Sequence, residues 1–184
     1  AKCLILRHVL EHIPNPVDFL FKVKEANGGG GLIYIEVPCF DWICERCAWY
    51  DIFYEHVNYF RLCDFNRMFG KVLASGKFFG NQYIYIVADL ETLCEPKYDK
   101  VNSACLPSDL SDKLVPCWSE NTVSKNLECV WGGSSKGVIF SLLCERSGRR
   151  VGSVIDINPA KQGKFLPTTG LLVQSPEDAL PSIA

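Results

Sequence analysis

The chain has 184 residues, of which 48% are hydrophobic, 22% charged and 12% aromatic. This composition is too apolar for a disordered tail and too charged for a membrane-spanning protein. Nineteen basic and twenty-one acidic residues give a net charge of −2, so no basic surplus favours nucleic acid or an anionic membrane surface. We expect a cytoplasmic globular protein of one or two small domains, with neither nucleic acid nor membrane as a partner.

The two ends of the sequence have an unusual character. Residues 1–6 form an apolar run with no initiator methionine, and residues 180–184 stop without a clear ending. No signal peptide and no apolar stretch of about 20 residues is present. We therefore expect a fragment that begins inside a buried strand of a larger protein.

The first half of the chain predicts a βαβ unit. Residues 2–6 form the first strand, Asn15 and Pro16 start a helix, and residues 32–37 form a second, almost wholly apolar strand, which is typical of a parallel sheet. An aromatic, irregular segment follows at 39–60. Residues 63–73 then predict a short helix and residues 82–88 another strand.

The second half predicts another βαβ unit after a polar linker. We expect three regions: the later half of one domain at 1–90, a linker at 91–126, and a small α/β domain at 127–184. The elements of this last domain are a strand at 127–131, a turn at 132–137, a helix at 138–144, a strand at 151–155 and a short strand at 171–173.

The glycine-rich turn at 132–137 lies between a strand and a helix, where backbone N–H groups can hold an anion. Its glycines match neither a P-loop nor the dinucleotide fingerprint. Asp156 ends the next strand, at about the separation expected of a ribose-binding acid. The pattern leaves two interpretations open: a nucleotide site, or a tight turn with Asp156 capping a loop.

Two short polar motifs carry candidate chemistry in the first half. His8, Glu11 and His12 follow the first strand, where ligands of an open α/β sheet gather. A metal site is not expected there, because Pro14 and Pro16 interrupt the regular helix that such a motif needs. Glu55 and His56 lie among aromatic residues and suggest a general acid–base pair, with a purely structural loop as the alternative.

Ten cysteines are scattered along the chain, and Cys44 and Cys47 form the only C-x-x-C pair. We expect plain buried or loop thiols, and a metal or redox pair is the alternative.

Several of these motifs together resemble the later half of a class I S-adenosylmethionine-dependent methyltransferase. More narrowly, they are similar to C-methyltransferases that act on nucleotide-linked deoxysugars. The resemblance implies a partial Rossmann-like methyltransferase sheet with the later strands only, followed by a second small α/β domain. The segments that carry it are 7–14, 34–38, 54–60, 79–83, 131–137 and 156–164.

The resemblance also implies residue roles in methyl transfer to a sugar carbon next to a keto group. His56 would be the base that generates the enolate, Glu55 a substrate-positioning or proton-relay partner, Tyr54 an oxyanion donor, and His8 a neighbour of the sugar and the sulfonium. The cofactor side would be shaped by Arg7, Glu11 and His12. The residues implied in contacting the nucleotide-sugar are Gly132, Ser134, Lys136, Gly137, Asp156, Asn158 and Lys161.

The sequence departs from this family in three places. The cysteine-rich zinc segment and the glycine-rich cofactor turn, which precede the matching region in the family, are not in these 184 residues. Only three residues separate Gly76 from Gly80, where the family has room for a further strand, and the linker before Trp131 is short. We therefore expect this fragment alone to bind the cofactor poorly and to be inactive as a methyltransferase. The alternative is a non-catalytic module that binds a nucleotide-sugar.

Overall fold

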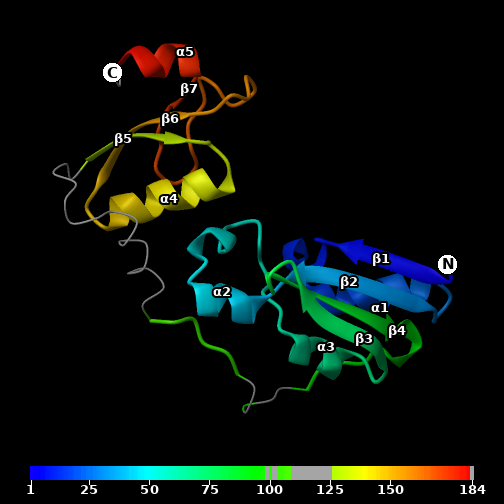
Figure 1. Ribbon diagram of the computed structural model, residues 1–184. Coiled ribbons are helices and arrows are strands. Elements are labelled where there is room, and N and C mark those ends of the chain that lie inside the picture. The colour runs from blue at the N-terminus through cyan, green and yellow to red at the C-terminus, as the bar shows by residue number, and fades with distance from the viewer. Residues whose placement is uncertain (98–99, 101–102, 109–125, 183–184) are drawn as a thin grey trace. The chain divides into compact units, whose positions relative to one another are not determined.

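A computed structural model describes residues 1–97, 100, 103–108 and 126–182. The chain divides into two compact units, whose elements are labelled in Figure 1. The first unit is formed by Ala1–Ala48 and Glu55–Pro107, and the second by Trp49–Tyr54 and Ser108–Ala184. The protein is thus of the mixed α/β class, with one sheet in each unit.

The first unit is built on a mixed four-stranded sheet with the strand order β1-β2-β4-β3. Its strands are β1 (Cys3–Arg7), β2 (Leu32–Pro38), β3 (Val72–Phe78) and β4 (Tyr83–Asp89). β1 and β2 are parallel, with Arg7 opposite Glu36, whereas β4 runs antiparallel to both β2 and β3. The carboxyl ends of β1 and β2 therefore lie side by side.

Short helices connect these strands. Pro16 occupies the first turn of the crossover helix α1, where its missing N–H costs nothing, and Gly28 and Gly29 follow the helix with positive φ. The helical elements of the unit are η1 (Leu10–His12), α1 (Pro16–Ala26), α2 (Phe40–Arg46), α3 (Leu62–Met68) and η3 (Leu90–Thr92).

The core of the first unit lies on one face of its sheet. Alternate residues of a strand point to the same face, so the isoleucines of β2 and β4 form one fully buried row. Leu20 of α1 and Phe65 of α3 belong to the same core. Tyr34 and Tyr85 occupy the alternate positions of β2 and β4, on the opposite face of the sheet. Their rings stack with 6.1 Å between centroids.

The second unit is a parallel three-stranded sheet with the order β5-β6-β7 and a crossover helix. Val138 and Cys144 of the helix share a buried core with Val154 and Val173 of the strands. The elements are η2 (Trp49–Asp51), β5 (Asn126–Trp131), α4 (Ser135–Arg146), β6 (Arg150–Ile155), β7 (Val173–Gln174), α5 (Pro176–Ala179) and η5 (Leu180–Ser182).

The structure confirms both predicted βαβ units and corrects three expectations. The aromatic segment 39–60, expected to be irregular, contains α2. The helix expected over 63–73 ends at Met68, and a strand that the sequence did not predict, β3, runs over Val72–Phe78. The first sheet is mixed rather than parallel, because a hairpin turn of positive-φ residues at 79–81 sends β4 back along β3.

Most of the predicted linker at 91–126 lies outside the described residues. In the described ranges, no helix is both long and apolar enough to cross a membrane.

Candidate functional site

A polar cluster lies at the carboxyl ends of β1 and β2. The backbone N–H of His8 donates to the carbonyl of Glu36 at 2.9 Å, which extends the β1–β2 pairing by one residue. His8 then takes a left-handed backbone conformation, with φ of 51°, and ends the strand. This turn places the imidazole at the edge of the sheet where the parallel strands end.

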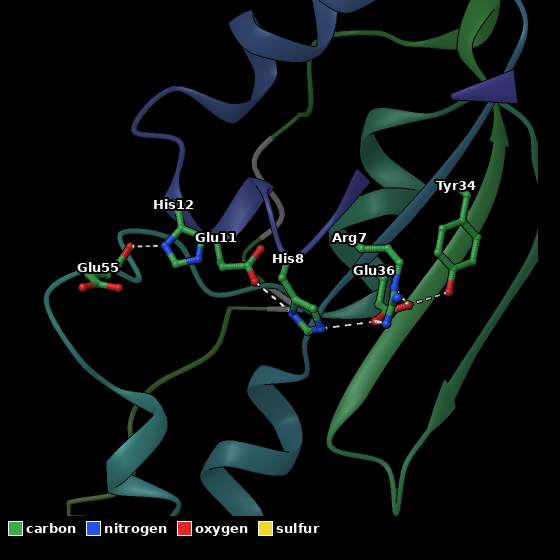
Figure 2. A network of polar contacts seen from close by, with 7 residues as sticks. All are labelled: Arg7, His8, Glu11, His12, Tyr34, Glu36 and Glu55. Atoms are coloured by element: carbon green, nitrogen blue, oxygen red, sulfur yellow. Dashed lines mark hydrogen bonds and ion pairs between the residues drawn. The ribbon is translucent and has the colours of Figure 1, made fainter. Parts of the chain in front are cut away.

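The His8 ring bridges two buried carboxylates, as Figure 2 shows. Its Nδ1 lies 3.2 Å from Glu11 Oε1 and its Nε2 lies 3.2 Å from Glu36 Oε1. The two carboxylate side chains are only 1% and 4% exposed, whereas the His8 side chain is 39% exposed. Tyr83 contacts the ring edge-on at 4.9 Å between centroids. The imidazole is thus fixed from within and open to solvent on one side.

Glu36 is ionised by its surroundings. Arg7 donates two hydrogen bonds to its carboxylate, both at 3.0 Å, and the Tyr34 hydroxyl donates a third at 2.8 Å. The Arg7 guanidinium holds the pKa of Glu36 below its usual range, and this effect outweighs burial, which acts in the opposite direction. Burial and the bond to Glu36 raise the pKa of Tyr34, so its hydroxyl remains a donor.

The imidazoles of His12 and His56 form a pair on the side of Glu11 away from His8. His12 Nδ1 lies 2.8 Å from the carbonyl oxygen of Glu55, and the rings of His12 and His56 are 5.0 Å apart. Backbone N–H groups of Val57 and Asn58 donate to the carbonyl of Glu11 at 2.8 and 3.1 Å. These bonds fix the loop that carries His56 against η1.

All three histidines of the chain belong to this cluster. His12 lies in η1 and His8 just before it, whereas His56 lies in a loop more than forty residues later in the chain. Glu11 connects the three histidines. Its Oε1 contacts His8. A carboxylate oxygen of Glu11 also lies within 4.8 Å of a ring nitrogen of His12 and of a ring nitrogen of His56. Such an arrangement can accept, donate or relay a proton.

The structure thus brings together five of the residues singled out from the sequence: Arg7, His8, Glu11, His12 and His56. Glu55 adjoins them through its backbone, but its side chain is exposed and points away from His8 and His12 (Figure 2). Tyr54 belongs to the second unit and is 59% exposed. The carboxylate among the imidazoles is therefore Glu11 rather than Glu55.

Sequence reasoning missed Glu36 and Tyr34 as members of the site. Glu36 is an ionisable residue in an otherwise apolar strand, close to its carboxyl end. A buried charge at that place needs a partner, and this signal was present in the sequence.

The glycine-rich turn of the second unit is fastened by Asp156. Gly133 N–H donates to Oδ2 at 2.8 Å, Asn158 N–H donates to Oδ1 at 2.9 Å, and Lys161 Nζ lies 3.0 Å from Oδ2. These donors, the Asn158 N–H first among them, hold the pKa of Asp156 below its usual range. The carboxylate matches the tight-turn interpretation, because bonds within the chain occupy both of its oxygens.

The other predicted residues of this turn have different surroundings. A Cβ on Gly137 would lie 1.7 Å from the carbonyl oxygen of Gly132, so only glycine fits there. Lys136 Nζ lies 4.7 Å from the centre of the Tyr50 ring, at cation–π distance. Lys161 also contacts the hydroxyl of Ser134, which precedes α4.

Cys44 and Cys47 form no metal-binding group within the described ranges. The Cys47 thiol donates to the carbonyl of Cys44 at 3.6 Å, and burial raises the pKa of the Cys44 thiol. Both are free thiols, and the raised pKa makes Cys44 less reactive than an ordinary cysteine.

Comparison with known proteins adds no assignment, because no protein-family model and no curated protein matches the chain.

Proposed function

We propose that this chain supplies the substrate-side half of an S-adenosylmethionine-dependent C-methyltransferase acting on a nucleotide-linked keto-deoxysugar. The observation that carries the proposal is the convergence of all three histidines with a buried carboxylate at the carboxyl ends of β1 and β2. In open α/β sheets, ligands bind beyond the carboxyl ends of the strands. The residues and motifs that carry the family resemblance in the first unit lie at the same place.

The sheet of the first unit supports the same proposal. A parallel β1–β2 pair joined through α1 is the repeating unit of doubly wound folds, and such folds commonly carry an antiparallel strand toward one end of the sheet. β4 is such a strand. We propose that the unit is the later part of a Rossmann-like methyltransferase sheet.

The chemistry that the cluster offers is removal of a proton from carbon. A carbon next to a keto group becomes nucleophilic when a base takes its proton and the electron pair moves toward the keto oxygen as an enolate. His56 is the proposed base, because its imidazole is half-buried and contacts the ring of His12 in η1. His8, held between two carboxylates, is the proposed neighbour of the sugar.

The charges of the cluster fit a cationic cofactor. The cluster contains two buried carboxyl groups, those of Glu11 and Glu36, and one guanidinium, that of Arg7, so its acidic groups outnumber its permanent cation. S-adenosylmethionine, when bound, supplies an electrophilic methyl group on a positive sulfonium. Arg7, Glu11 and His12 would form the near side of its site.

The proton-removal step can be tested on the 184-residue chain, because it needs the sugar and the base but no methyl donor. We expect the chain, incubated in D2O with nucleotide-linked keto-deoxysugars and a chelator, to incorporate deuterium at the carbon next to the keto group, as followed by NMR. His56→Gln should lower the exchange rate at least about 100-fold. Glu45→Gln, an exposed carboxylate on α2, is the matched control and should exchange at the rate of the unmodified chain.

Exchange that survives His56→Gln would place the base elsewhere. No exchange above the buffer rate with any keto-sugar nucleotide, in a chain whose circular dichroism is that of a folded protein, would contradict the proposed function.

A second candidate function, a non-catalytic nucleotide-sugar module, is favoured by one observation in the second unit. Ser134 and the ammonium group of Lys161 lie together at the amino end of α4, where helix N–H groups are available to a phosphate. This candidate predicts thermal stabilisation by a nucleotide-sugar that Lys161→Ala abolishes. It also predicts that His56→Gln leaves the stabilisation unchanged.

A further inference from the structure

We propose that Glu11, His12 and His56 form a binding site for a divalent transition-metal ion such as Zn²⁺ or Co²⁺. Each offers one ligand atom, and these three atoms lie within 4.8 Å of one another. Two imidazoles and one carboxylate are a donor set that suits zinc and its neighbours in the first transition row.

The carboxylate of Glu11 gives a second, independent indication that a cation binds here. The residue is 1% exposed, and its Oε2 is buried, yet no group among the described residues hydrogen-bonds to it. The other oxygen, Oε1, is held by His8. A buried carboxylate oxygen without a partner is costly, and coordination to a cation removes that cost.

The imidazole of His12 is already oriented for coordination. Its Nδ1 is bonded to the Glu55 carbonyl, which can only accept, so in the neutral imidazole Nδ1 carries the proton and Nε2 keeps its lone pair. In Figure 2 this second ring nitrogen faces Glu11. A hydrogen bond from the far ring nitrogen to a backbone carbonyl is the usual support of a metal-ligating histidine.

The three ligand atoms need to move only slightly closer together to coordinate one metal ion. Ligand atoms about 2.1 Å from a tetrahedral metal ion are about 3.4 Å apart, so the present separations must shrink by roughly 1.4 Å at most. His12 is exposed and His56 half-buried, so this change involves side chains that are at least partly open to solvent. Three protein ligands leave a fourth position open to water or to an oxygen atom of another molecule.

This inference goes beyond the proposed function and is opposed to it in one respect. A metal ion on His56 occupies an imidazole that proton removal requires. The metal-loaded chain should therefore lose deuterium exchange.

The test is a titration of the tag-free chain with Co²⁺, followed by calorimetry and visible absorption. Because the chain has no other histidine, any imidazole coordination must come from His8, His12 or His56. Cys44→Ser/Cys47→Ser serves as the background, so that the C-x-x-C thiolates do not compete. We expect one ion per chain and an absorption spectrum without thiolate-to-metal charge-transfer bands.

Single substitutions then assign the ligands. His12→Ala removes an exposed side chain, should leave the fold intact, and should weaken binding at least about 10-fold, as should His56→Gln. Glu11→Gln should do the same, but it alters a buried residue, so the conclusion rests on the two histidine variants. Glu45→Gln, the exposed control, should change the affinity less than about 3-fold.

Three results would overturn the proposal. They are no binding at about 0.1 mM Co²⁺, unchanged binding in both histidine variants, or spectra that show thiolate ligands. The cobalt titration and the deuterium-exchange assay can fail independently, because cobalt binding needs no sugar and deuterium exchange is measured with a chelator present.

Discussion

At the residue scale, the histidine cluster contains two buried carboxylates with different surroundings. Glu36 has three donors besides His8, whereas Glu11 has His8 on one oxygen and nothing among the described residues on the other. The first is a satisfied structural anion that orients His8 and Arg7. The second has a buried oxygen that no described group hydrogen-bonds, and the proposed metal site depends on this oxygen.

The Glu36 network predicts a pH-dependent loss of stability. A carboxyl group whose pKa is lowered by folding stabilises the native state above its unfolded pKa of about 4.3, and the contribution is lost as the pH falls through the lower folded pKa. Glu36→Gln should therefore cost about 1–2 kcal/mol of unfolding free energy at pH 7, and the difference from the unmodified chain should shrink in acid.

Urea unfolding between pH 3 and pH 7 measures this difference. Glu25→Gln, an exposed carboxylate on α1, is the control and should show a difference near zero throughout. A Glu36→Gln penalty that stays constant down to pH 3 would mean that the charge of Glu36 contributes nothing.

Asp156 predicts the same sign of pH dependence in the second unit. Asp156→Ala removes the acceptor for Gly133, Asn158 and Lys161 and should cost about 2–3 kcal/mol at pH 7. Because folding lowers the pKa of this carboxyl, the penalty is fully present above about pH 4 and is lost in stronger acid. Thermal melts of Asp156→Ala beside Glu177→Gln, an exposed acid on α5, would show whether the penalty is specific.

At the element scale, the β5–α4 turn depends on one glycine. Gly137→Ala would bring a Cβ to 1.7 Å from a backbone oxygen, and a backbone clash cannot be relieved by turning a side chain. We expect a loss of at least about 3 kcal/mol, larger than an ordinary overpacking substitution. Gly148→Ala is the comparison, because its Cβ would meet nothing within 4 Å and only its positive φ, 76°, is strained.

Gly148→Ala should cost about 1–2 kcal/mol. Equal losses in the two variants, measured by urea unfolding, would contradict the described path of the turn.

The elements predicted from sequence agree with the structure where hydrophobic patterning is strong. β2 and β4 were predicted to within one residue, because their apolar runs are bounded by glycine, proline or polar residues. β3 was missed because the small and polar residues in its centre, such as Ser75 and Gly76, leave no alternating apolar pattern. Gly76 is there for a tertiary reason: a Cβ would lie 2.9 Å from the Tyr85 ring.

The candidate site was predictable only in part. The motifs placed His8, Glu11 and His12 after the first strand, but sequence adjacency suggested Glu55 as the partner of His56. Neighbouring side chains in a non-helical loop point in different directions, so adjacency does not imply contact. The pairing of Glu11 with the imidazoles arises from loop docking, which is a property of tertiary structure.

At the scale of the whole molecule, each unit has its own sheet and its own buried core. A disturbance of one core should therefore leave the other largely protected, since distant sites without shared partners act independently. Hydrogen exchange of Gly137→Ala should show faster exchange in α4 and β6 and unchanged protection in β2 and β4. Faster exchange throughout the chain would contradict this independence.

The most direct test of the central claim, that substrate reacts at the imidazole cluster, uses the fact that the chain has only three histidines. A long-range ¹H–¹⁵N spectrum then contains imidazole signals from His8, His12 and His56 alone, and single substitutions assign them. Addition of a nucleotide-linked keto-deoxysugar, in chelator, should shift the His8 and His56 signals in a saturable manner, while the nucleotide without its sugar should not. If all three imidazoles keep their positions while the sugar nucleotide binds the chain, the cluster is not the site of reaction.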